Sequence, residues 1–398
     1  MVARAIARSF VLNAFAAASG LAATLYITWS LGLSEFAYYT INFAKLSVIM
    51  VGAELLPSSF TLFRLQEDSD FDAAVPVFYL FIAIAGATGA AGLIALGLVS
   101  HQSWFMVAFV FGAVVQRYFD TQAQACGKVD AYFWIPATTN VTRLVLLAGL
   151  SQFHSMSAAD VLWLSVAAAA FAGQAVMVSR FPEFLEPASY RRPFSKLHYL
   201  WSMRAAYYDY YPNSVLKRLR DTFLPVFCDL VVPSKVEIGR LLVFTRANEA
   251  VCGQVRVLEA FMVNRASRSH IRDSRRRIFL IIAPIGQFCV AAVALALMYR
   301  HGIGIVDVAL ALATGLFIYP YILELYWRND ALAAFAPKRV TTSLLSFLVV
   351  LALPPIVALA FGRVSIVVFI LSYVCAQIAA AATYKVLGGS APISPNAG

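Results

Sequence analysis

Basic side chains stand deep inside several long apolar segments of this sequence, where the chemistry open to them is the binding of an anion. An ionisable group in the hydrocarbon core of a bilayer costs about 2.5–3.5 kcal/mol on insertion scales, so each must face protein, water or a partner. The cations that we select for an anion site are Lys45, Arg143, Arg220, Arg246 and Arg256. The acids that we select as candidates for ion coupling are Glu54, Asp120, Asp221 and Glu249.

Arg143 is the clearest of these cations. It stands about midway through the apolar run 132–151, and no acid lies three or four residues away on the same helix face. A deep arginine of this kind either binds an anionic ligand or pairs with an acid on another helix. The sequence leaves both explanations open.

The apolar run 237–262 carries a polar stripe. Arg246, Glu249, Gly253, Arg256 and Ala260 recur at steps of three and four, so they share one helix face. One explanation is a salt-bridge ladder, Arg246 with Glu249 and Arg256 with Glu259, that keeps helices in register. The other is the wall of a water-filled cavity.

The composition defines the elements that must position these side chains. The 398 residues are 61% hydrophobic and 13% charged, which is about half the charge of an ordinary soluble domain, roughly 25%. This excludes a water-soluble globule and predicts an all-α, polytopic membrane protein. Apolar runs of about 20 residues, the length of a membrane span, predict twelve transmembrane helices at 9–31, 37–57, 76–99, 104–125, 132–151, 159–179, 213–232, 237–262, 278–299, 303–326, 341–361 and 364–385.

Lysine and arginine are distributed unevenly over the loops between these spans. With the N-terminus in the cytoplasm, nineteen of the 31 basic residues fall on the inner side and only Lys235, Arg300 and Arg363 on the outer side. This positive-inside asymmetry places both termini in the cytoplasm. The net charge of +10 is then explained by topology and by attraction to lipid headgroups, and no nucleic-acid partner is expected.

The spans divide into two halves of six. The polar, aromatic stretch 181–212 predicts a connector in the cytoplasmic interface between an N-terminal bundle, 1–180, and a C-terminal bundle, 213–398. A shift of 202 residues places Glu35-Phe36-Ala37 over Glu237-Ile238-Gly239, each opening a helix just after an outer turn. Such an offset is typical of transporters built from repeats.

Catalytic patterns are missing from the sequence. The five histidines fall in loops or at helix ends, so no pair on one helix face could bind a metal. There is no GxxxxGK[ST] motif for a nucleotide phosphate. We therefore expect no enzyme activity, no cofactor and no metal.

Short motifs resemble a transporter family. The segment Ser30-Leu31-Gly32-Leu33-Ser34-Glu35-Phe36-Ala37-Tyr38-Tyr39 is similar to the opening turn of polysaccharide and O-antigen flippases (the Wzx type) of the multidrug/oligosaccharidyl-lipid/polysaccharide exporter (MOP) superfamily, with Ala37 where the family usually has glycine. Leu219-Arg220-Asp221 with Val236-Glu237-Ile238-Gly239-Arg240 resembles its second-half counterpart, and Ala125-Cys126-Gly127-Lys128 the inner turn after the fourth helix.

The resemblance implies two six-helix halves around a central cavity and an alternating-access flippase. Its cargo would be an undecaprenyl-diphosphate-linked oligosaccharide, moved from the inner to the outer leaflet of the bacterial cytoplasmic membrane. The lipid tail would pass at gaps between the first and eighth helices and between the second and seventh. The diphosphate would meet Arg143, Lys45 and Arg246, and the sugars would meet Asn13, Asn42, Asn140 and Tyr39.

Two other functions stay open. A cation-coupled small-molecule or drug antiporter of the same superfamily would need a cavity lined mainly by acidic side chains. The charged side chains deep inside the spans of this sequence are mainly basic. A polymerase or non-catalytic subunit of a polysaccharide assembly complex would need a sizeable outer loop, and the spans leave no room for one. The expected partners are the lipid-linked oligosaccharide, membrane lipids and other polysaccharide assembly proteins.

The charge asymmetry makes a topology prediction. Reporter proteins fused after Arg192 and after Lys385 should both be cytoplasmic, and one fused near Arg300 should be outside, because basic loops stay on the cytoplasmic side. The activity of a reporter that works in only one compartment measures this. Ends on opposite sides of the membrane would contradict the even number of spans and the two-half organisation.

Overall fold

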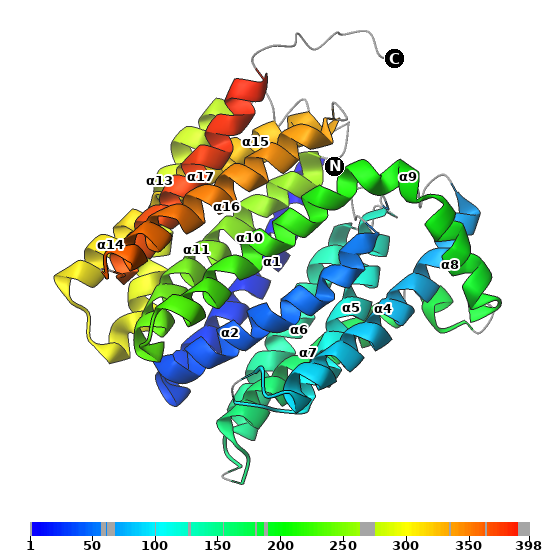
Figure 1. Ribbon diagram of the computed structural model, residues 1–398, viewed down its shortest axis with the longest axis horizontal. Helices are drawn as coiled ribbons and strands as arrows, with labels where there is room; N and C mark the ends of the chain where they lie inside the picture. The colour runs from blue at the N-terminus through cyan, green and yellow to red at the C-terminus, as the bar shows by residue number, and fades with distance from the viewer. Residues whose placement is uncertain are drawn as a thin grey trace.

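The computed structural model describes residues 2–56, 61, 68–99, 101–125, 129–153, 155–179, 181–186, 190–262, 275–333, 336–362 and 364–388. Every regular element in these ranges is helical, as Figure 1 shows. The motif turn 126–128 and most of the basic loop 265–277 lie outside the described residues. The fold class predicted from the composition is confirmed.

Eight helical segments among the described residues are long and apolar enough to cross a membrane. In lipid, only a helix can satisfy its own backbone polar groups within a single segment. These eight segments are built from α1 (Val2–Tyr26) with η1 (Ile27–Leu31), α2 (Leu33–Ile49) with η2 (Met50–Leu55), α4 (Ser69–Ala95), α7 (Ala158–Val178), α13 (Arg275–Met298) with η6 (Tyr299–His301), α14 (Ile305–Gly315) with α15 (Ile318–Ala333), α16 (Pro337–Ala360) and α17 (Ile366–Gly388).

Four further helices have the length of a span without being among those eight. They are α5 (Phe105–Ala125), α6 (Val129–Leu150), α10 (Tyr211–Val231) and α11 (Lys235–Met262). These four carry most of the charged side chains selected from the sequence. Together with the eight apolar segments they complete the twelve spans that the sequence predicts.

The helices form two lobes that are visible in Figure 1. In the first lobe α1 packs on α6, α4 and α6 pack on α5, and α7 packs on α5 and α6; in the second, α16 packs on α17 and α10, α13 on α14, and α15 on α17. The lobes meet along three helix pairs, which are α1 with α11, α2 with α11 and α2 with α10. Polar side chains on these pairs therefore face the other half of the chain.

The segment between the lobes is held to the first lobe. It contains η3 (Pro182–Leu185), α8 (Pro193–Ser202), α9 (Arg204–Tyr207) and η5 (Tyr208–Tyr210). The Tyr199 hydroxyl donates to Oδ2 of Asp68 at 2.6 Å, and Oδ1 of Asp68 caps the first turn of α4. Phe194 and Trp201 on α8 are exposed, as expected of a helix at a membrane surface. Figure 1 places α8, the start of α1 and the end of α17 toward the same end of the bundle.

The tenth span differs from the continuous helix expected over 303–326. The structure breaks it into α14 and α15 around Leu316 and Phe317. Pro320 explains the break, because proline has no N–H to donate and its ring clashes with the carbonyl four residues earlier, here that of Leu316.

The two copies of the repeat motif pack against each other. Gly32, at φ +97°, ends η1 in a conformation that favours glycine, and α2 begins directly after it. Gly239, in the first turns of α11, lies so close to α2 that a Cβ there would overlap the carbonyl oxygen of Leu33 and stand 2.9 Å from its carbonyl carbon. The short side chain at Gly239 therefore lets the two lobes approach at this point.

Two glycines of α11 test this close approach. We expect Gly239→Ala to lower the melting temperature of the purified protein, because overpacking costs about 1–3 kcal/mol. Gly253→Ala is the matched control, since a Cβ there meets nothing within 4 Å and alanine favours a helix by about 0.8–1.0 kcal/mol over glycine. Equal melting temperatures for the two variants would exclude the packing role of Gly239.

Candidate functional site

An ion cluster joins α2 to the C-terminal end of α10 and the start of α11. Lys45 of α2 pairs with Asp229 of α10, with 2.9 Å between Nζ and Oδ2. Lys235, at the start of α11, donates to the other oxygen of Asp229 and lies over the ring of Tyr38, 5.8 Å from its centroid. Lys45, selected as a cation for the cargo, thus has an acid partner on the opposite lobe.

A second cluster joins η2, which continues α2, to the first half of α10 and to α5. Oε1 of Glu54, which is 5% exposed, lies 3.2 Å from Nη2 of Arg218 on α10 and 3.5 Å from Nη2 of Arg117 on α5. One carboxylate thus serves two guanidinium groups from different lobes. Glu54, selected as a candidate for ion coupling, thus connects the two lobes.

Amide side chains join α1 to its neighbours. Asn13 donates to the carbonyl oxygen of Gly253 at 2.9 Å and to Oε1 of Gln254 at 3.2 Å, and Gln254 donates back to the carbonyl of Asn13. Asn140 of α6 donates to the carbonyl oxygen of Ala16 at 2.8 Å. In this structure, contacts therefore join both helix pairs at which the resemblance implies lateral gaps.

Arg143 has an environment unlike that of the other selected cations. Its side chain is 7% exposed, and its guanidinium carbon lies 4.9 Å from the ring centroid of Tyr39 on α2. The Tyr39 ring is supported from behind by Trp163 of α7, with 5.4 Å between centroids. Within the described part of the chain, Arg143 makes no ion pair and its Nε has no hydrogen-bond partner.

A buried donor without an acceptor is costly, by about 1–3 kcal/mol and more for a charged group. The packing of Tyr39 and Trp163 fixes the plane of the guanidinium, and the five N–H groups of an arginine match the oxygens of a phosphate or carboxylate. An anion bound beside Arg143 would therefore supply the acceptor that the guanidinium lacks among the described residues.

Arg246 is on the opposite lobe from Arg143. The two guanidinium groups and Tyr39 interact electrostatically, although Arg143 is on α6 and Arg246 on α11. Arg246 pairs with Glu249 at 2.9 Å, and their side chains are 45% and 48% exposed in the middle of a membrane-length helix. The pair expected from the helix spacing thus forms, on an exposed face of α11.

Arg220 belongs to a different, closed network inside the second lobe. Its Nη1 lies 3.0 and 3.2 Å from the two carboxylate oxygens of Glu324 on α15, and its Nη2 donates to Gln377 of α17 at 2.7 Å. Arg328 lies 3.7 Å from Glu324, and the Arg220 guanidinium also covers the ring of Phe347 at 4.4 Å. Arg220 is thus fully partnered, at a distance from the joint between the lobes.

The remaining selected residues are on α2, α5, α10 and α11. Asn42 of α2 is buried at 1% exposure, Asp221 is exposed, and Asp120 of α5 is half-buried and makes no ion pair with the described residues. The side chain of Arg256 lies outside the described residues.

Two acids that organise the charges were not selected from the sequence. Asp229 holds Lys45 and Lys235, and Glu324 holds Arg220 and Arg328. The signal for Glu324 was an acid in an otherwise apolar run, which is costly in a membrane. The sequence contains no signal for the pairing itself, because the partners are on different helices.

Comparison with protein-family models and with curated proteins gives no match. Solved structures do match. An inward-facing multidrug resistance MATE family transporter of the MOP superfamily superimposes with a TM-score of 0.65 at 10% identity, covering 93% of each chain. A MATE in complex with MaL6 gives 0.65 at 10% identity over 97% of this chain and 95% of that one. A mutant of the Vibrio cholerae MATE transporter VcmN gives 0.61 at 13% identity over 98% and 97%.

The chain has the MATE fold. This agrees with the superfamily that the short motifs resemble, and it places the joint between α1, α2, α10 and α11 at the interface between the two lobes of that fold. At these sequence identities the similarity shows the fold alone. The cargo is therefore inferred from the side chains.

Two arginines in this fold should respond oppositely to substitution. We expect Arg220→Ala to lower the melting temperature strongly, because removing one member of a buried ion pair costs about 3–5 kcal/mol. Arg143→Ala should leave it unchanged or raise it, because the substitution removes a buried cation that has no partner. Thermal unfolding of both variants in the same lipid nanodiscs measures this. Similar losses in both variants would show that Arg143 has a structural acid partner.

Proposed function

We propose that this protein is an alternating-access transporter whose cargo carries an anionic group to Arg143. In its more specific form, the proposal is a flippase for an undecaprenyl-diphosphate-linked oligosaccharide in the bacterial cytoplasmic membrane. The observation that carries it is the buried guanidinium of Arg143, stacked on Tyr39 and without an acid among the described residues. The motif resemblance and the MATE fold support the transporter class.

The side chains of this joint have separate tasks in the proposed cycle. Arg143 binds the anionic group of the cargo in a bidentate way, and Arg246 supplies a second cation. Glu249 neutralises Arg246 when the site is empty. When an anion arrives between the two guanidinium groups, Arg246 can exchange Glu249 for the cargo, which releases the carboxylate. The exchange links cargo binding to the charge on α11.

The change of access requires the two lobes to separate on one side at a time. The Lys45–Asp229 pair lies near the C-terminal end of α10, and the Glu54–Arg218 pair lies in its first half, so the two pairs hold different points of the contact between α10 and the segment formed by α2 and η2. When the lobes separate at one cluster, its ion pair breaks while the other pair stays formed. The two pairs therefore hold the lobes together in turn. Asp120, Asp221 and Glu249 remain candidates for the protonation that couples this cycle to an ion gradient.

A small-molecule antiporter is the second candidate, and the solved structures favour it because one of them is a multidrug resistance MATE family transporter. A cationic drug would need an acid at the level of Arg143. Glu249 is the acid there, and it is already paired with Arg246. The local excess of positive charge therefore favours an anionic cargo over a cationic one.

The anion site makes a transport prediction. Purified protein in proteoliposomes should flip a fluorescent undecaprenyl-diphosphate-linked sugar. Arg143→Ala should slow flipping by more than about tenfold, because a hydrogen bond to a charged group contributes about 1.5–3 kcal/mol. Arg143→Lys should recover only part of the rate, because an ammonium group cannot hold two phosphate oxygens in one plane.

The control is Arg204→Ala, which removes an exposed arginine on the connector, and its flipping rate should match the wild type. Ethidium efflux from the same proteoliposomes tests the antiporter. Normal flipping by Arg143→Ala would remove Arg143 from the cargo site, and ethidium efflux without flipping would favour the antiporter.

A further inference from the structure

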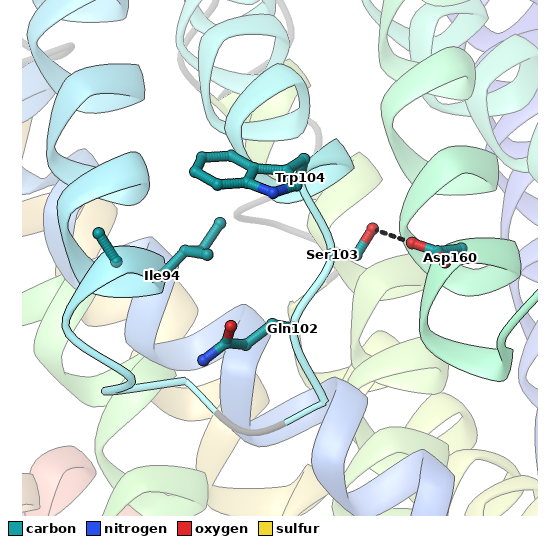
Figure 2. Close-up of a pocket in the computed structure, with 6 residues that line it drawn as sticks. Ile94, Gln102, Ser103, Trp104 and Asp160 are labelled. Carbon is teal, nitrogen blue, oxygen red and sulfur yellow. Dashed lines mark hydrogen bonds between the residues drawn. The ribbon is translucent and has the colours of Figure 1, made fainter.

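A hollow lies at the end of the first lobe that is opposite the connector, on the predicted outer side. It has a volume of about 480 Å³ and is lined by Ile94, Ala95, Gln102, Ser103, Trp104 and Asp160. These residues come from the end of α4, the loop to α5 and the first turn of α7 (Figure 2). The volume lies within the range of about 300–1,000 Å³ that is typical of small-molecule pockets.

Two side chains border the hollow with unused hydrogen-bonding groups. Figure 2 shows the indole of Trp104 on one side and the amide of Gln102 on the other, with Ile94 between them. Trp104 is 66% exposed. Neither its N–H nor the Gln102 amide has a partner among the residues that the structure describes. A ligand here would meet an aromatic face, an apolar wall, a donor and an amide.

The loop that carries Gln102 is anchored on both sides of it. The ring of His101 stacks on Tyr38 at 3.9 Å between centroids, and its Nδ1 lies 3.1 Å from Oε2 of Glu35. On the other side, the Ser103 hydroxyl donates to Oδ1 of Asp160 at 2.8 Å. Gln102 is thus held in place before any ligand arrives, which lowers the entropy cost of binding.

The lining chemistry selects one class of ligand. None of the six residues is basic, and the one charged residue is the acid Asp160, so a phosphate or another anion is disfavoured. A purely apolar chain would leave the amide of Gln102 without hydrogen bonds, whereas the Asp160 carboxylate already accepts from the hydroxyls of Ser103 and Ser157 and has lone pairs for a further donor. A neutral sugar satisfies both requirements, because one face of its ring presents C–H groups to an indole while its hydroxyls donate to and accept from amides and carboxylates.

We propose that this hollow is a saccharide-binding site, in which a neutral sugar stacks on Trp104 and hydrogen-bonds to Gln102 and to Asp160. The inference rests on the proposed function in identifying the sugar as part of the transported glycan. It adds a site outside the space between the lobes, at the predicted point where the glycan emerges.

Binding of free oligosaccharides to the full-length protein tests the site without requiring transport. The protein is held in lipid nanodiscs, because maltoside detergents carry a disaccharide that would compete. The probes are cellotetraose, mannotriose and galactotriose at millimolar concentrations, detected by saturation-transfer NMR and titration calorimetry. We expect at least one probe to bind.

Variants locate the bound sugar. Trp104→Ala and Gln102→Ala should each weaken binding by about fivefold to tenfold, the effect of losing one contact or hydrogen bond. Trp104→Phe should retain most of the affinity because it keeps an aromatic face. The matched controls are Gln152→Ala, an exposed glutamine in the loop between α6 and α7, and Trp201→Ala on the connector, and both should bind as the wild type does.

The outcomes separate this site from the proposed function. Arg143→Ala should still bind the sugar even if it no longer flips lipid, because the two sites are apart. Competition by a glucosyl diacylglycerol added to the nanodiscs would still place a saccharide in the hollow and identify a membrane lipid as its source. Binding of none of the three probes, unchanged binding by Trp104→Ala, or equal loss in Arg143→Ala would overturn the proposal.

Discussion

The cost of a charge in hydrocarbon governs the arrangement of this chain. Each ionised group must be paired or reached by water, and the helices that carry most of these groups, α5, α6, α10 and α11, are the ones that are not apolar enough to count as spans on their own. They turn their charges toward partner helices of the same lobe or the other one. The cost of exposing these charges to lipid thus drives the association of the two halves, where purely apolar helices would gain little from leaving the lipid.

The same constraint separates rigid from movable parts. The Arg220–Glu324 pair, whose side chains are 11% and 1% exposed, is enclosed within the second lobe, and breaking it would strand a buried charge. The Lys45–Asp229 pair across the lobes is 25% and 17% exposed, so water can replace a lost partner there. Exposed pairs contribute little to stability. The enclosed Arg220–Glu324 network within one lobe and the more exposed Lys45–Asp229 pair between the lobes are what a transporter needs if its halves move as rigid bodies.

The sequence predicts the helical architecture better than it predicts which charged side chains pair. Span length, the two halves and the helix starts at residues 37 and 237 follow from local apolar runs and turns, and the structure begins the two helices a few residues earlier, at Leu33 and Lys235. Ion pairs within one helix can also be predicted from the sequence, as the Arg246–Glu249 pair shows. The acids that pair with Lys45 and Arg220, Asp229 and Glu324, are on other helices, and helical spacing says nothing about contacts between helices. The hollow at Gln102 depends on loop contacts of the same long-range kind.

Arg143 differs from the membrane cations that pair with acids. Lys45, Arg218 and Arg220 each have an acid within 3.2 Å, so each of these three membrane cations is neutralised by the fold itself. For Arg143 it supplies instead an aromatic platform, Tyr39, which orients the guanidinium without neutralising it. A platform of this kind preserves the affinity of the cation for an external anion, whereas an acid would abolish it. The position of Arg143 beside an exposed pair on the opposite lobe would then let a single bound anion contact both lobes, which is the requirement for coupling cargo binding to their movement.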